Sequence, residues 1–95
     1  MPLNKGVNFK AKAEKKNRFQ ISKLIRWEYK LEPTQLLKVT VSIIGLAGVR
    51  EIFLTNMRKD GRITIPFIAA ALLKKSAQFL EGRAIEVILE PAQTK

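Results

Sequence analysis

Apolar and polar residues alternate with a period of two near the start of the chain, over residues 7–13. This period is typical of a strand with one face in the core, and it turns Lys10 and Lys12 toward water. The rest of the first half predicts a charged turn, a short strand, a helix and a strand rich in Val, Ile and Leu, over residues 14–18, 19–21, 23–31 and 35–44.

Two local signals bound the predicted helix of the first half. Ser22 is a good N-cap, because its hydroxyl can accept a hydrogen bond from a backbone N–H of the first turn. The Glu32-Pro33 pair ends the helix, since the residue before a proline avoids the helical conformation. The apolar positions form one stripe that we expect to face the core, made of Leu24, Ile25, Trp27 and Leu31.

The second half repeats this order of elements. After the connector Gly45-Leu-Ala-Gly48 come a strand over residues 49–57 and a turn with the hairpin dipeptide Asp60-Gly61. A short strand leads to Pro66, a residue suited to the first helical position. The later elements are a helix to about Leu80, a strand over residues 84–89 and a tail over residues 91–95.

A shift of 44 residues lays the first half on the second, so that Phe9 falls on Phe53 and Arg18 on Arg62. After the helices the shift becomes 48, because the second helix is longer by about one turn. We therefore predict one α+β domain, mainly β, over residues 1–95. Its two strand-turn-strand-helix-strand copies are predicted at residues 7–44 and 49–90.

Composition removes most catalytic classes. The 95-residue chain has no Cys and no His, so it has no thiolate or imidazole for zinc, no disulfide and no His general base. Its carboxylates are scattered, and no two are predicted on one face for acid–base work. We expect no enzyme activity, no metal and no cofactor. With no apolar stretch of about 18 residues and no apolar signal region, we expect a cytoplasmic protein without a membrane partner.

Charge points to a polyanionic partner. The formal net charge is +10, and residues 1–44 hold ten basic and three acidic residues, so the first half is the more basic. Nucleic acid is the expected partner, since lysine and arginine bind phosphates regardless of sequence. The candidate nucleic-acid-binding residues are Lys10, Lys12, Lys15, Lys16, Arg18, Lys23, Arg26, Arg58, Lys59 and Arg62.

Aromatic residues have two interpretations. Trp27 and Tyr29 are next to Arg26 and could stack on unpaired bases. The interpretation we favour places Trp27 in the core, together with Phe19, Phe53, Phe67 and Phe79. The Gly45–Gly48 segment is interpreted as a turn, because an RNA-clamping KH loop needs a helix on each side and strands flank this one.

The second half carries a recognisable motif. Residues 59–66, Lys-Asp-Gly-Arg-Ile-Thr-Ile-Pro, and residues 80–87, Leu-Glu-Gly-Arg-Ala-Ile-Glu-Val, resemble the AbrB/SpoVT/MazE-like family of swapped-hairpin DNA-binding domains. The first half resembles a degenerate copy, with Ser22 in place of the proline and Thr34 in place of the glycine. The chain is thus similar to a fused pseudo-dimer of the MraZ kind, which implies a swapped-hairpin barrel and a monomer or weak dimer.

The resemblance implies a DNA-binding transcription regulator or nucleoid protein. It carries the family's motif arginine onto Arg62 and Arg18, and its helical basic residue onto Arg26, whereas Ala70 stands in the second copy. The alternative is an RNA-binding protein of the ribosome that uses the same basic face on rRNA. A partition or antitoxin role is less favoured, because few residues follow Glu90. We expect duplex DNA to be preferred over folded RNA.

Overall fold

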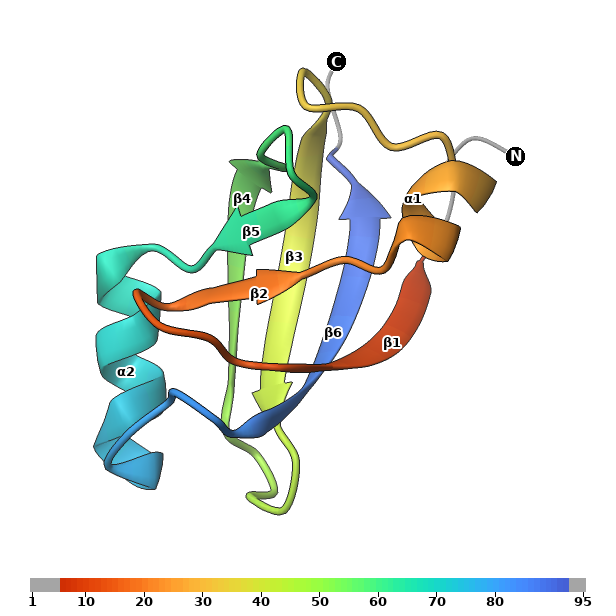
Figure 1. Cartoon of the computed structure of the whole chain (residues 1–95). Coiled ribbons are helices and arrows are strands. Elements are labelled where there is room, and N and C mark those ends of the chain that lie inside the picture. Colours follow the sequence, from red (N-terminus) through yellow and green to blue (C-terminus); the bar gives the residue numbers. More distant parts are fainter. Residues whose placement is uncertain (1–5, 93–95) are drawn as a thin grey trace.

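The computed structural model of the protein describes residues 6–92, and its fold is α+β with more strand than helix, as predicted (Figure 1). These residues form six strands and two helices. In chain order they are β1 (Val7–Lys12), β2 (Arg18–Gln20), α1 (Lys23–Glu28), β3 (Leu36–Ile43), β4 (Arg50–Asn56), β5 (Arg62–Thr64), α2 (Phe67–Ala77) and β6 (Ala84–Pro91).

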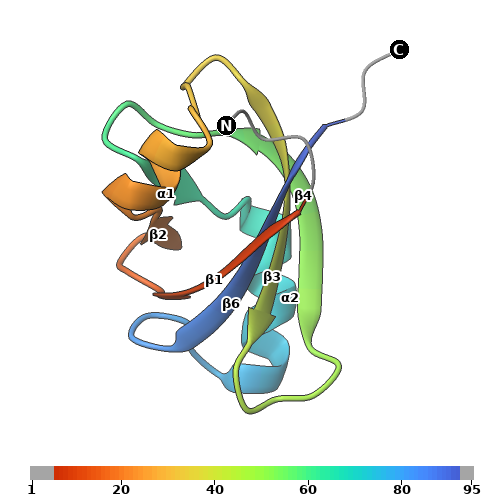
Figure 2. The ribbon, with the colours of Figure 1, turned by 90° about the vertical axis from the view of Figure 1, so that its right-hand side faces the viewer.

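The strands form two antiparallel sheets. The larger has the order β1-β6-β3-β4, and β2 pairs with β5 in a separate two-stranded ribbon. The ribbon crosses in front of the larger sheet, with α1 and α2 at its opposite ends (Figure 1). Turned by 90°, the ribbon and α1 lie on one side of the sheet (Figure 2). The larger sheet is open, with β1 and β4 at its edges, and no closed barrel is seen in residues 6–92.

Every pairing between these strands joins one half of the chain to the other. β1 pairs with β6, β2 with β5, and β3 with both β4 and β6. The registers also repeat: Phe9 faces Val87, and the equivalent pair after shifts of 44 and 48 residues, Phe53 and Val39, face each other too. The two halves are therefore related by a pseudo-twofold arrangement, with Phe19 opposite Ile63 at the middle of the ribbon.

Local sequence signals predicted most ends of the helices and strands to within a few residues of their observed positions. The Ser22 cap is confirmed, because its Oγ accepts a hydrogen bond from the Ile25 N–H at 3.2 Å. α1 ends at Glu28, earlier than predicted, and Lys30 has a positive φ of 53°. Pro66 is the N-cap of α2 and not its first residue. β6 continues to Pro91, so the predicted tail starts too early, and its residues 93–95 lie outside the described part.

The Asp60-Gly61 turn does not join a hairpin. It reverses the chain between β4 and β5, with the Arg58 N–H donating to the Arg62 oxygen at 2.8 Å, but the two strands then pair with β3 and β2. The predicted turn is confirmed, but the strands on its two sides do not pair with each other, because a turn signal sets only the local reversal and burial of the strand faces decides the partner.

The core lies between the ribbon and the sheet. Phe19 and Ile63 of the ribbon pack there with the inward residues of β3 and β6 and with Leu73 of α2. The core prediction was right for Phe19 and wrong for two other phenylalanines, since Phe67 and Phe79 are 83% and 57% exposed. Phe53 is partly buried against the core.

No helix formed by residues 6–92 has the length and apolar character that crossing a bilayer requires.

Candidate nucleic-acid interface

Each strand-connecting turn is docked at the helix start of the other half. The Asn17 oxygen accepts a hydrogen bond from the Ile65 N–H at 2.7 Å, just before α2, and the Gly61 oxygen accepts one from the Ile21 N–H at 2.9 Å, just before α1. The turn with Lys15 and Lys16 thus lies beside the first turn of α2. The turn with Lys59 lies beside the first turn of α1.

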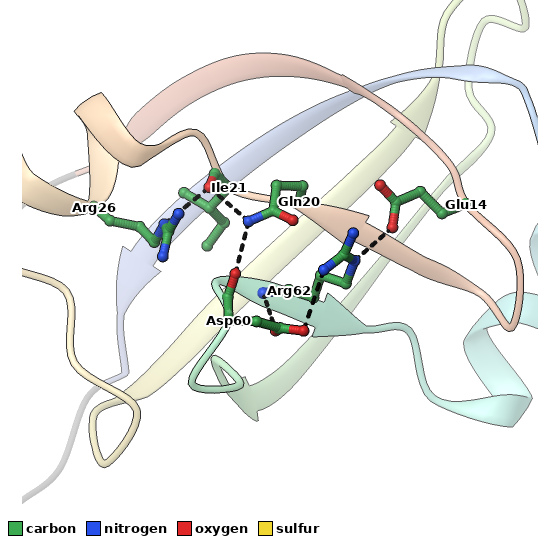
Figure 3. A network of polar contacts seen from close by, with 6 residues as sticks. All are labelled: Glu14, Gln20, Ile21, Arg26, Asp60 and Arg62. Carbon is green, nitrogen blue, oxygen red and sulfur yellow. Dashed lines mark hydrogen bonds and ion pairs between the residues drawn. The ribbon is translucent and has the colours of Figure 1, made fainter.

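Arg62 is held by two carboxylates (Figure 3). Its Nε lies 2.8 Å from Glu14 Oε1, and its Nη1 lies 3.2 Å from Asp60 Oδ2. The Arg62 backbone N–H donates to Asp60 Oδ1 and lowers the pKa of that carboxyl, while the hydrogen bond to Glu14 raises the pKa of Arg62. Arg62 was predicted to contact phosphate, and its charge is already balanced within the protein.

Arg26 supports the same region from α1. Its Nε donates to the Ile21 oxygen at 3.0 Å, and Gln20 Nε2 donates to the Asp60 oxygen at 2.8 Å (Figure 3). The guanidinium lies against Gly61, where a Cβ would come within 2.6 Å of the Arg26 Nε. Arg26 therefore packs the turn between β4 and β5 onto α1, and Gly61 is the residue that leaves room for its guanidinium.

Gly61→Ala should destabilise the protein more than Gly82→Ala. Both glycines have φ near +85°, at 86° and 85°, so each substitution should cost about 1–2 kcal/mol in backbone strain. A Cβ added at position 82 would meet open space. A Cβ added at position 61 would displace the Arg26 guanidinium and its hydrogen bond, which costs about 1 kcal/mol or more in addition. Urea unfolding of the two variants measures the difference. Equal losses would contradict the packing role of Arg26.

Arg18 has a different environment from Arg62. It lies on the ribbon opposite Thr64, half-buried, and its Nε is buried without a hydrogen-bond partner among residues 6–92. An unpaired buried donor is costly, and for a charged group the cost is larger. Arg18 is thus a candidate for an external anion.

The other predicted residues are exposed, and they come from three segments of the chain. Lys10 and Lys12 project from the outer face of β1, where Lys10 is paired in register with Glu86. Lys15 and Lys16 extend from the turn between β1 and β2. A third group belongs to α1 and to the segment between β4 and β5, and its exposed members are Lys23, Arg58 and Lys59.

A basic groove beside α1 adds residues that the sequence did not single out. It measures ≈ 460 Å³ and is lined by Lys23, Arg26, Trp27, Lys30, Leu31 and Glu32. Trp27 is 79% exposed, so the prediction that it is a core residue was wrong. Ile25 of α1 and the C-cap residue Tyr29, four positions apart, pack against the core. The four-residue spacing of Ile25 and Tyr29 was the sequence signal that could have predicted which face of α1 is buried.

A second depression lies at the β3–β4 turn. Its volume is ≈ 840 Å³, and Lys10, Arg50 and Glu86 line it together with residues 42–49. Gly45 and Gly48 both have positive φ, and strands flank the segment, as predicted. Among residues 6–92, no three Asp or Glu side chains gather in a way that could hold a metal ion.

Comparison with known proteins bears on the fold alone. No family model and no curated protein matches the chain. The chain is similar to PHS018 from Pyrococcus horikoshii, known from a solution structure, with a TM-score of 0.70 and 17% sequence identity. The match covers 99% of this chain and 100% of that one. At this identity the likeness extends to the arrangement of strands and helices.

Proposed function

We propose that this protein binds nucleic acid and that unpaired bases are part of what it recognises. The observation that carries the proposal is Trp27, an exposed aromatic side chain within a groove lined by Lys23, Arg26 and Lys30. Cations bind the phosphates of a strand, and an aromatic face stacks on its bases. The net charge of +10 supplies the long-range attraction.

Folded RNA fits this surface better than a regular duplex. Bases in loops and bulges are unstacked and free to meet Trp27, whereas bases in a duplex are stacked on each other. The basic residues are also spread over β1, the two strand-connecting turns and α1, which suits an irregular array of phosphates. An RNA-binding role, such as that of a ribosome-associated protein, is therefore the first candidate function.

Duplex DNA is the second candidate, and the pseudo-twofold arrangement favours it. The two strand-connecting turns lie at opposite ends of the ribbon, as paired DNA-contacting turns would in a swapped-hairpin protein. All pairings between halves are also what a fused swapped-hairpin pair requires. In this interpretation the chain is a monomeric pseudo-dimer, and it acts as an AbrB-like regulator or nucleoid protein.

Trp27→Ala should weaken RNA binding by roughly 5- to 100-fold, the loss expected for one stacked base. The experiment is a competition between structured RNA and duplex DNA of equal phosphate number at one ionic strength, which removes the shared electrostatic contribution. The matched control is Leu24→Ala, an exposed apolar residue of the same helix without an aromatic face. We expect wild-type protein to prefer the RNA, and the control to keep that preference.

The opposite results are equally informative. Preference for duplex DNA, with no effect of Trp27→Ala, would reject the first candidate in favour of the DNA regulator. Failure to bind either nucleic acid at low salt would overturn the proposed function.

A further inference from the structure

The ribbon contains two equivalent arginine environments with opposite charge. A shift of 44 residues maps Arg62 onto Arg18, and it maps the two acidic partners of Arg62, Glu14 and Asp60, onto Arg58 and Lys16. One arginine therefore lies between two carboxylates. At the equivalent positions of the other half, the arginine is Arg18 and the two acidic positions are basic.

Backbone hydrogen bonds support this equivalence. The Glu14 N–H donates to the Arg18 oxygen, and its counterpart, the Arg58 N–H, donates to the Arg62 oxygen. The turns obey the same relation at Ile21 and Ile65, described above. The register of β2 on β5 is symmetric about the Phe19–Ile63 pair. Residue 58 is thus placed relative to Arg18 as Glu14 is placed relative to Arg62.

The Arg18 side lacks the anion that the Arg62 side contains. At Arg62, Glu14 Oε1 accepts a hydrogen bond from Nε at 2.8 Å. At Arg18, Nε is buried and has no acceptor among residues 6–92. Arg58 and Lys16 are exposed, so their charges are accessible from solution. Since the pseudo-twofold relation places residues 58 and 16 around Arg18 as residues 14 and 60 are placed around Arg62, the Arg18 side is a suitable place for a doubly or singly charged oxyanion.

We propose that Arg18, Arg58 and Lys16 form a phosphate-binding site, in which a phosphate oxygen takes the place at Arg18 Nε that the Glu14 carboxylate takes at Arg62 Nε. Resting on the proposed function, this inference assigns the site to a phosphodiester group of the bound nucleic acid. The Arg62 side is neutralised from within. The ribbon therefore offers one phosphate site per chain and grips nucleic acid from one side.

The test installs the missing carboxylate in the intact chain. Arg58→Glu places an acidic residue where Glu14 stands in the other half, while Arg18→Gln removes the positive charge of the guanidinium. Lys75→Glu, an exposed lysine of α2, makes the same change in net charge away from the ribbon. Two measurements apply to each protein: the change in Tm in about 100 mM inorganic phosphate against chloride of equal ionic strength, and nucleic-acid affinity as a function of salt.

The Tm of the wild-type protein and of Lys75→Glu should rise by roughly 5 °C in phosphate, at a phosphate concentration well above the dissociation constant of the site. Arg58→Glu and Arg18→Gln should lose this gain. Arg58→Glu should also raise Tm in chloride, because it gives Arg18 an internal partner. Arg58→Glu should weaken nucleic-acid binding by about tenfold more than Lys75→Glu, with a salt slope smaller by about one further unit.

The two proposals fail separately. If phosphate stabilises the wild type and Lys75→Glu but neither ribbon variant, and yet no nucleic acid binds, the anion site stands and the proposed function falls. If nucleic acid binds and Arg58→Glu weakens it no more than Lys75→Glu, the site is overturned while the function stands. Equal stabilisation by phosphate and chloride in the wild type also overturns the site.

Discussion

Phe19→Ala should lower the free energy of unfolding by about 3–5 kcal/mol, the usual range for truncating a buried phenylalanine. Phe19 is 0% exposed at the middle of β2, opposite Ile63, and its ring centroid is 6.5 Å from that of Phe9. It thus links the ribbon to the sheet at the pseudo-twofold axis. Domains of this size are stable by about 5–15 kcal/mol, so the variant should lose a large share of its stability. Circular dichroism in urea measures the loss.

Phe67→Ala is the matched control, and it should change the free energy of unfolding by no more than about 0.5 kcal/mol. Its side chain is 83% exposed at the start of α2, so truncation leaves no cavity. The chemical change is the same as at Phe19. A loss at Phe67 comparable with that at Phe19 would mean that the α2 face is covered in solution and would contradict the exposed position.

Much of the secondary structure could be predicted because its causes are local. Ser22 accepts a hydrogen bond from the first turn of α1, and a proline at position 66 suits a helix start, whatever the rest of the chain does. The alternation in β1 follows from one face being covered. Internal repetition extended these signals, since the shifts of 44 and 48 residues carry β2 onto β5 and β3 onto β6.

Local sequence signals could not predict which strands pair with each other or which face of α1 is buried. The Asp60-Gly61 turn is a strong hairpin signal, yet β4 pairs with β3 and β5 pairs with β2, because burial of each strand's apolar face decides its partner. In α1, two apolar spacings compete over six residues. Ile25 and the C-cap residue Tyr29 pack against the core, and Trp27 is exposed to solvent.

The candidate site shows the same division. The charged sequence of residues 14–18 and the Asp-Gly dipeptide in residues 58–61 correctly predicted turns, and Lys15, Lys16 and Lys59 are exposed there. The difference between Arg62 and Arg18 was not predictable from the motif they share, because it depends on a contact between Glu14 and Arg62, which are 48 positions apart. Only the folded ribbon brings those side chains together.

Separated halves of the chain should be unfolded as monomers, and mixing them should restore the fold. Each strand pairing joins residues on opposite sides of the Gly45–Gly48 connector, so a half made by dividing the chain there keeps none of them. A half of about 45 residues is also near the lower limit for a stable core. Circular dichroism should report no sheet for residues 1–46 or 47–95 alone and native signal for an equimolar mixture.

Light scattering supplies the control for this experiment. The intact chain contains both partners, so we expect it to be monomeric at micromolar concentration, and the mixed halves should have the mass of one chain. A half that dimerises with itself would fit the same architecture, because the pseudo-twofold arrangement lets a second copy of residues 1–46 stand where residues 47–95 stand, with Glu14 of one copy facing Arg18 of the other. A half that folds as a monomer would contradict it, since strands would then have to pair within one half, which the observed registers do not do.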